Sequence, residues 1–208
     1  MIPIRPLGLA LSAWMMASCG GASRSGQPSD AEALEALYLA RSDSARMRFD
    51  QADVVFVTGM LAHHAQAIEM AELAPPRAES SSVRTLAARI INAQVDEIAL
   101  MELWLRDRGQ PVPATGAEHA EHLPGMLTAA ELEELGRSTD RAFDRLFLTY
   151  MIRHHEGAVA MVEELLAAER SVQDPATFEL ASDIHVDQST EIARMQQLLT
   201  ALPTGGAG

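Results

Sequence analysis

Two pairs of adjacent histidines are the residues in this sequence with the clearest capacity for chemistry. A Gln-x-x-Glu pattern follows each pair further along the chain. Neutral imidazole binds copper, zinc, iron and nickel, and a carboxylate oxygen can complete such a ligand set. These residue types therefore indicate a transition-metal site. The candidate metal ligands are His63, His64, His154, His155, Glu97 and Glu191.

A methionine precedes each histidine pair by about one helical turn, Met60 in the first case and Met151 in the second. A thioether adds a preference for Cu(I), so copper is the metal that this residue set favours, and both methionines join the candidate ligands. Aromatic residues make up only 4% of the chain, however, and methionine also fills aromatic-poor cores. The methionines by themselves fit both explanations.

The histidine pairs lie in two copies of one repeated unit. Residues 53–71, DVVFVTGMLAHHAQAIEMA, align without a gap with residues 144–162, DRLFLTYMIRHHEGAVAMV, and eight of nineteen positions are identical. Residues 90–105 align in the same way with residues 184–199, and seven of sixteen positions agree. Repetition of this kind indicates that one structural unit occurs twice in the chain.

All four repeated segments show the three- and four-residue spacing of apolar positions that predicts amphipathic helices. His63 falls in the middle of the apolar face of the first helix, whereas His64 falls towards its edge. Gln94 and Glu97 fall in the middle of the apolar face of the second helix. We expect the inward residues of both copies to converge in one buried site. The central set is then His63, His154, Glu97 and Glu191, with His64 and His155 nearer the edge.

A buried network of His–Glu hydrogen bonds would produce the same pattern without a metal, because a buried carboxylate needs a partner. Both explanations stay open at this point. Hydrogen bonding is the expected role of Gln94 and Gln188, as partners behind the metal ligands. Asp53 and Asp144 stand near helix starts, where a negative charge favours the helix dipole or could orient a histidine ring.

Helix-breaking residues separate the four predicted helices and predict an all-α fold. Four amphipathic helices in this order predict a four-helix bundle built from two tandem helix-pair repeats, at about 50–108 and 140–202. A further helix is expected over 31–48, and a capping box at Thr128 and Glu131 predicts a short helix. The breakers that end the first, second and third helices are Ala74-Pro75-Pro76, Gly109-Gln110-Pro111 and Asp174-Pro175.

The N-terminal residues resemble an export signal with a lipid attachment site. A short apolar run extends from Leu7 to Ala17. Cys19, the only cysteine, follows shortly after it in a setting that resembles a bacterial lipobox. We therefore predict a signal peptide over residues 1–18, lipidation of Cys19, a flexible tether over 19–30 and a helical domain over 31–202. The protein would then be extracytoplasmic and would meet the cell envelope through a lipid anchor only.

The charge balance argues against a nucleic-acid partner. The chain has 29 acidic and 16 basic residues and a formal net charge of -13. Binding of a phosphate backbone needs clustered basic side chains. An acidic surface is compatible with a metal ion as the partner. The sequence does not specify an oligomeric state.

The repeated motif resembles a known family. The pattern D-x-x-F-x-x-x-M-x-x-H-H-x-x-A-[IV]-x-M, followed by I-x-x-x-Q-x-x-E-I-x-x-M, occurs twice and is similar to the DUF305 family, a domain of unknown function. The resemblance covers about residues 50–200, including Leu123-Pro-Gly-Met126. It implies a ferritin-like four-helix bundle in exported bacterial proteins, some of which are associated with copper binding and copper tolerance.

Three functions are compatible with these observations. The first is an exported copper-binding lipoprotein for metal buffering or tolerance. The second is a non-catalytic envelope module with a purely structural His–Glu core. The third is a ferritin-like redox enzyme, for which Glu97 and Glu191 supply few carboxylates for a dinuclear site. No residue is assigned a catalytic role.

Overall fold

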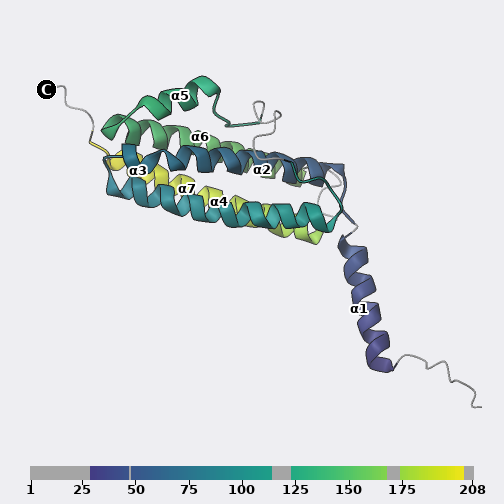
Figure 1. Cartoon of the computed structure of the whole chain (residues 1–208). Coiled ribbons are helices and arrows are strands. Elements are labelled where there is room, and N and C mark those ends of the chain that lie inside the picture. The colour runs from purple at the N-terminus through teal and green to yellow at the C-terminus, as the bar shows by residue number, and fades with distance from the viewer. Residues whose placement is uncertain (1–28, 47, 114–122, 168–173, 204–208) are drawn as a thin grey trace, which may run out of the picture. The chain divides into compact units, whose positions relative to one another are not determined.

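The computed structural model describes residues 29–46, 48–113, 123–167 and 174–203, and these residues are all-α (Figure 1). Within these ranges no residue belongs to a β-strand, and one isolated bridge joins Ala78 to Asp140. The prediction of an all-α fold is confirmed. The predicted signal peptide, Cys19 and the predicted tether up to residue 28 lie outside the described residues.

Helix α1 (Asp30–Arg46) confirms the helix expected over 31–48. It stands in a different structural unit, at least in its first half, from the helices that carry the repeats. Three of its large apolar side chains, Leu34, Leu37 and Tyr38, are exposed. No helix in the described part of the chain combines the length and the apolar composition needed to cross a membrane.

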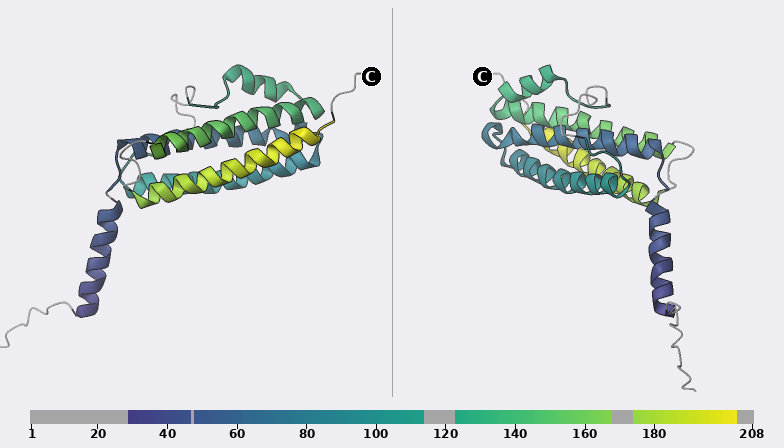
Figure 2. Two further views of the ribbon diagram at one scale, coloured as in Figure 1. Left: turned by 180° about the vertical axis from the view of Figure 1, so that it is seen from behind. Right: turned by 45° about the vertical axis from the view of Figure 1, so that its right-hand side comes forward.

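The repeated segments form long helices that run alongside one another, as views from two further directions show (Figure 2). Helix α2 packs against α4 and against α6, and α6 packs against α7. The two helices of each repeat are therefore neighbours, and the two repeats meet through α2 and α6. The long helices are α2 (Gln51–Glu72), α4 (Ser81–Asp107), α6 (Asp140–Ala167) and α7 (Pro175–Ala201).

Two short helices lie outside the repeated segments, α3 (Ala74–Arg77) and α5 (Ala129–Arg137). The capping box predicted at Thr128 and Glu131 is present at the start of α5, so that prediction is confirmed. Glu131 also accepts a hydrogen bond from Arg153 of α6 at 2.7 Å. This contact holds α5 against the helix that carries the second histidine pair.

Two of the predicted breakers act differently from the expectation. Pro75 and Pro76 do not simply end a helix, because they form the first turn of α3 after α2 has ended at Glu72. The pair Asp174-Pro175 begins α7 instead of ending α6, whose last residue is Ala167. Proline at the first helical position lacks an N–H that would be unpaired in any case, so the same residue can start a helix.

The Asp174 carboxylate joins the start of α7 to the end of α4. Its Oδ2 accepts hydrogen bonds from the indole N–H of Trp104 at 3.1 Å, from the Arg108 guanidinium at 2.5 Å and from the Thr177 hydroxyl at 2.9 Å. All four side chains are buried. A buried charge is tolerated only with such partners, so this cluster closes one end of the helices.

The core consists of two apolar clusters at different positions along the long helices. The first cluster contains residues that follow the histidine pair in α2 and precede it in α6. The second cluster contains residues that precede the pair in α2 and follow it in α6. The first cluster includes Met70, Ile90, Phe143, Phe147, Met151 and Met195. The second includes Phe56, Met60, Met101, Trp104, Met161 and Ile184.

Candidate metal centre

The candidate site is a layer of polar side chains between the two apolar clusters, which we call the polar belt. Each long helix contributes two residues near the middle of its length, and every one of them is buried except the half-buried Glu191. Such a layer inside an apolar core is costly unless its groups pair or bind a ligand. The polar belt consists of His63, His64, Gln94, Glu97, His154, His155, Gln188 and Glu191.

Each repeat holds one histidine against one glutamate. His64 Nε2 lies 2.5 Å from a carboxylate oxygen of Glu97, and His155 Nε2 lies 2.8 Å from a carboxylate oxygen of Glu191. A carboxylate only accepts, so Nε2 carries the proton in each pair and donates it. In a neutral ring the other nitrogen, Nδ1, is then the one with the lone pair. In both rings Nδ1 is buried with no hydrogen-bond partner among the described residues.

The placement of His64 and His155 corrects the expectation that they lie nearer the edge of the apolar face of their helices. Their exposed fractions are 1% and 0%, so they are as buried as the inward histidines. The reason is that α2 packs against two helices at once. One side of its buried face meets α4, where His64 contacts Glu97, and the other side meets α6. A pattern read from one helix cannot show that both sides are covered.

Of the four residues expected to converge, the two inward histidines meet directly, whereas Glu97 and Glu191 contact His64 and His155. The ring centroids of His63 and His154 are 3.9 Å apart, with the ring planes tilted by 47°. The His63 Nε2–H donates to the backbone carbonyl of Pro124 at 3.0 Å. Neither ring nitrogen of His154 has a partner in the described parts of the chain. The two copies therefore differ at this position, and His154 has two uncommitted nitrogens.

Burial keeps both inward imidazoles neutral. Loss of hydration lowers the pKa of His63 to about 3, although the Pro124 carbonyl acts in the opposite direction. Loss of hydration lowers the pKa of His154 well below its usual value, and the nearby histidines add to the effect. A neutral imidazole keeps a lone pair for a metal, whereas a protonated one does not. Both rings are therefore in the form that binds metal ions.

Residues 123–127, which we call the strap, position His63 from outside the long helices. The Gln66 side chain makes two hydrogen bonds to the backbone of Leu127, at 3.0 and 2.8 Å. Gly125 has a φ of 78°, which favours glycine. The strap also passes so close to α6 that a side chain at Gly157 would collide with the Pro124 carbonyl. Glycine at 157 therefore permits the contact between Pro124 and His63.

Gly157→Ala is expected to lower the stability of the protein by about 1–3 kcal/mol, because the new methyl group collides with backbone atoms that cannot rotate away. The strap must move, and the hydrogen bond from His63 to Pro124 is lost with it. A thermal melt of the metal-free protein measures this effect as a fall in Tm of several degrees.

Gly136→Ala is the matched control for this variant. Gly136 lies in α5, and an added Cβ there meets no atom within 4 Å. Alanine is favoured over glycine in a helix, so the Tm of the Gly136→Ala variant should stay level or rise slightly. Equal melting curves for Gly157→Ala and the unchanged protein would show that the strap is not held as tightly as the structure indicates.

The remaining predicted residues are distributed around the belt. Met60 and Met151 are fully buried, but they belong to different apolar clusters. Gln94 and Gln188 are buried as well, and Gln94 Oε1 has no hydrogen-bond partner among the described residues. The hydrogen-bonding role expected for Gln94 and Gln188 therefore stays a prediction.

Asp53 and Asp144 are buried but bind backbone groups and not histidines. Asp53 accepts a hydrogen bond from the Asp50 N–H at 2.9 Å and completes the capping box of α2. Asp144 accepts one from the N–H of Ser80, the residue before α4, at 2.8 Å. Asp53 therefore takes the helix-start role, whereas Asp144 binds the backbone at the start of α4, a different helix from its own. Burial raises the pKa of both carboxyl groups.

Sequence reasoning missed the strap carbonyl of Pro124 and the Gln66 side chain. The Pro-Gly dipeptide in Leu123-Pro-Gly-Met126 predicts a turn, but it does not indicate which carbonyl faces a histidine 61 positions away. Gln66 follows the first histidine pair, and glycine stands at its counterpart, 157. This difference between the two copies was the available signal for the strap, because the Gln66 side chain binds the strap and Gly157 leaves room for it.

The polar belt offers nitrogen donors that are not yet arranged as a closed ligand set. Among the described residues, no three His, Cys, Asp or Glu side chains converge closely enough to hold a metal ion as they stand. Four buried ring nitrogens nevertheless lack partners, two on His154 and one each on His64 and His155. Buried polar atoms without partners are rare in folded proteins and call for a ligand, an ordered water or a rearrangement. The donor chemistry fits a borderline or soft cation.

Comparison with known proteins gives one family and several solved structures. The model of the family "Domain of unknown function (DUF305)" matches residues 53–199. A DUF305 fragment from Deinococcus radiodurans is 36% identical, with a TM-score of 0.66 over 74% of this chain and 98% of that one. A DUF305 protein from Streptomyces coelicolor, described as a presumed secreted protein, is 28% identical, with a TM-score of 0.64 over 75% and 98%.

A third similar structure is CopM in its Cu(II)-bound form, which is 36% identical, with a TM-score of 0.59 over 71% of this chain and 95% of that one. CopM has also been solved in Cu(I)-bound and silver-bound forms. No curated protein sequence matches the chain.

Proposed function

The chain belongs to the DUF305 family, and on that premise we propose that it binds copper at the polar belt and acts outside the cytoplasm in copper buffering or tolerance. The observation that carries the proposal is the set of buried ring nitrogens without partners on His64, His154 and His155. Support also comes from CopM, a relative whose structures contain copper or silver. Copper accepts imidazole nitrogen and, as Cu(I), thioether sulfur.

The proposal gives the belt residues different tasks. His154 and His63 would bind copper through ring nitrogens, and His64 and His155 through Nδ1. Glu97 and Glu191, predicted as ligands, hold the Nε2–H of their histidines, which is how many metal-binding histidines are oriented. The two carboxylates would bind copper themselves only if their hydrogen bonds to His64 and His155 were broken. Met60 and Met151 are the proposed sulfur donors for Cu(I).

The proposal includes an anchored, exported protein with a duplicated fold. Residues 1–18 would be the signal peptide, and Cys19 would carry the lipid at the start of the 19–30 tether. A relative that is described as a presumed secreted protein is compatible with export. The helices of residues 31–202 would form a ferritin-like four-helix bundle built from two tandem helix-pair repeats.

Copper titration of the purified mature chain tests the proposal. We expect stoichiometric binding of Cu(I) in competition with a chromophoric chelator, and at least one copper per chain by elemental analysis after gel filtration. His185→Ala is the matched control because this half-buried histidine of α7 lies outside the belt, and it should bind as the unchanged protein does. Copper retention no higher than that of a protein without a histidine core would refute the proposal.

The non-catalytic envelope module is the second candidate, and the two His–Glu pairs favour it. Both carboxylates of the belt already have histidine partners without any metal. This candidate predicts the same Tm with copper or with chelator. Copper binding predicts a higher Tm, since a ligand at about a thousandfold its Kd stabilises the folded state by about 4 kcal/mol. A redox enzyme is disfavoured because the belt has only these two carboxylates.

A further inference from the structure

Helices α4 and α7 leave a groove between them that is both apolar and acidic. Its volume is about 700 Å³. One continuous stripe of α4 lines it from Ala93 to Asp107, and a stripe of α7 lines it from Ala176 to Asp187. At 1.5 Å per residue, the α7 stripe is roughly 17 Å long, which is about three turns of helix.

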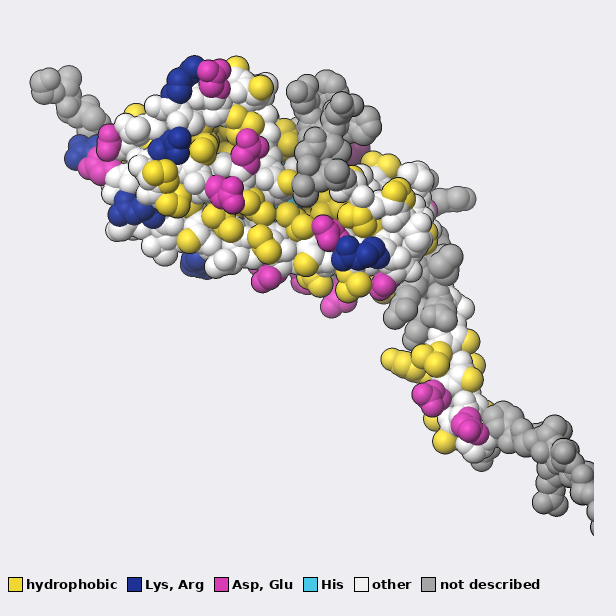
Figure 3. Space-filling model, viewed as in Figure 1, with side chains coloured by type: hydrophobic (Ala, Val, Ile, Leu, Met, Phe, Trp, Pro, Cys, Tyr) yellow, Lys and Arg dark blue, Asp and Glu magenta, His cyan; other side chains and the backbone are white. Residues whose placement is uncertain are grey.

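The apolar part of the groove is exposed to solvent. Leu100, Leu103 and Val186 line it and have exposed fractions of 57%, 49% and 61%. In the space-filling view, hydrophobic side chains lie beside acidic ones along the lower edge of the molecule, over α4 (Figure 3). Isolated apolar side chains are normal on a surface, but a lined groove of them marks an interaction site.

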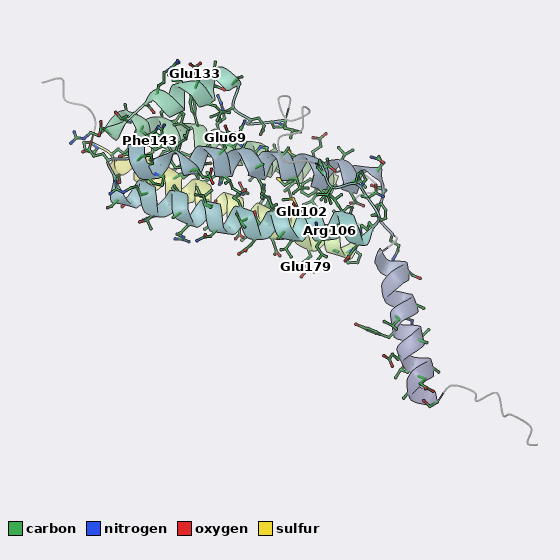
Figure 4. The ribbon with its side chains drawn as sticks, viewed as in Figure 1. Glu69, Glu102, Arg106, Glu133, Phe143 and Glu179 are labelled. Carbon is green, nitrogen blue, oxygen red and sulfur yellow. The ribbon has the colours of Figure 1, made fainter. Side chains whose placement is uncertain are left out.

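The acidic part of the groove follows a helical spacing. Glu179, Asp183 and Asp187 stand four residues apart on α7 and form what we call the acidic rail. Figure 4 shows Glu179 projecting beside the end of α4 that carries Glu102 and Arg106. Asp96, Glu97 and Asp107 add acidic groups from the α4 side.

The two arginines at the end of α4 beside the groove are already engaged. Arg108, the basic side chain in the lining, is buried against Asp174 at 2.5 Å and stacks on the Trp104 ring. Arg106 pairs with Glu102 at 3.1 Å on its own helix. The rail therefore keeps its negative charge. Burial and the like charges of Glu97, Glu191 and Asp183 raise the pKa of Asp187, as expected for carboxylates that repel one another without a counter-charge.

We infer that the groove between α4 and α7 is a docking site for a cationic amphipathic helix of a partner protein. The apolar side of that helix would lie on Leu100, Leu103 and Val186. Its basic residues, spaced by four, would face the acidic rail. Helix-in-groove recognition uses this division between apolar anchors at three- and four-residue spacing and a charged margin.

The charge of the groove disfavours a second copy of this chain as the occupant. Two such grooves would bring their acidic rails together, and the chain as a whole has a net charge of -13. A simple cation would satisfy the carboxylates but leave the apolar lining exposed. A helix with an apolar side and a basic side matches both the apolar lining and the acidic residues of the groove. This inference does not depend on copper binding.

A synthetic peptide of sixteen residues tests the inference. Leucines at three- and four-residue spacing form one side, and lysines four residues apart flank it. Fluorescence anisotropy with the full mature chain should show saturable one-to-one binding. Carbodiimide coupling should then join peptide lysines to Glu179, Asp183 or Asp187. The chain has no lysine of its own, so it forms no internal lysine cross-links that would obscure the map.

Charge reversal on the rail provides the decisive comparison. Asp183→Lys with Asp187→Lys should weaken peptide binding by at least about tenfold, since attraction becomes repulsion. Both residues are exposed, and removing the repulsion at Asp187 should leave Tm level or higher. Glu69→Lys with Glu72→Lys changes the net charge equally on exposed positions of α2, away from the groove, and should weaken binding far less.

Several outcomes would overturn the inference. Equal weakening by both double variants would show general charge attraction, and cross-links elsewhere would place the peptide on another surface. Equal binding of a peptide with lysines but no leucines would show that the apolar lining takes no part. Self-association that blocks the peptide and is abolished by Leu100→Asp would identify a second copy as the occupant.

Discussion

His154→Ala is expected to lower the affinity for copper by at least about a hundredfold. Even residues that only orient a metal-binding histidine change affinity by about ten- to a hundredfold, so a direct ligand should have at least that effect. His154 has two ring nitrogens without partners and lies 3.9 Å from the His63 ring, between the two repeats. Competition titration with a Cu(I) chelator measures the change.

The equivalent residue of the first repeat should matter less. A neutral imidazole has one lone pair. His63 can present it only on Nδ1, because its Nε2–H is committed to the Pro124 carbonyl, whereas His154 can present it on either nitrogen. We expect His63→Ala to lower copper affinity by about tenfold. Because alanine also leaves a cavity, Tm of each variant must be measured, and His154→Gln keeps most of the volume. Equal losses for His63→Ala and His154→Ala would contradict the asymmetry that the strap creates.

The metal-free protein is expected to lose about 4 kcal/mol of its free energy of unfolding between pH 7.5 and pH 5. Burial lowers the pKa of His63 to about 3 and that of His154 well below 6.5. Below pH 6.5 the unfolded chain therefore binds protons at these imidazoles, whereas the folded chain does not. The free energy of unfolding has its full value above that pH and decreases as the pH falls. Each imidazole contributes up to about 1.4 kcal/mol per pH unit.

Urea unfolding at a series of pH values, with a chelator present, measures this slope. The pKa values of Asp53 and Asp144 are raised, so these groups act in the opposite sense, as they gain protons in the folded state before the unfolded one. Their effect begins in more acidic solution, because the ordinary pKa of Asp lies near 4. His154→Gln should remove about half of the slope, whereas His185→Ala should leave it. A flat profile between pH 7.5 and pH 5 would rule out neutral buried imidazoles.

The sequence predicted the helices and their core faces well because these depend on local spacing. The repeat of apolar residues by three and four positions placed His63, Gln94 and Glu97 inside, and all three are buried. The capping box at Thr128 was also readable, because its two partners are three residues apart. The role of Pro175 could not be predicted in this way, because a proline can end one helix or start the next equally well.

By itself the sequence determined the composition of the site: a His-His pair and a Gln-x-x-Glu pattern in each of two copies, on helices whose apolar faces must be buried. Only the tertiary structure decided the partners. His64 and His155 donate hydrogen bonds to the glutamates, and His63 donates one to a carbonyl of the strap. These choices depend on α2 packing between α4 and α6 and on a glycine at 157 that admits the strap. Long-range packing sets them, and helical periodicity contains no information about which neighbour covers each side of a helix.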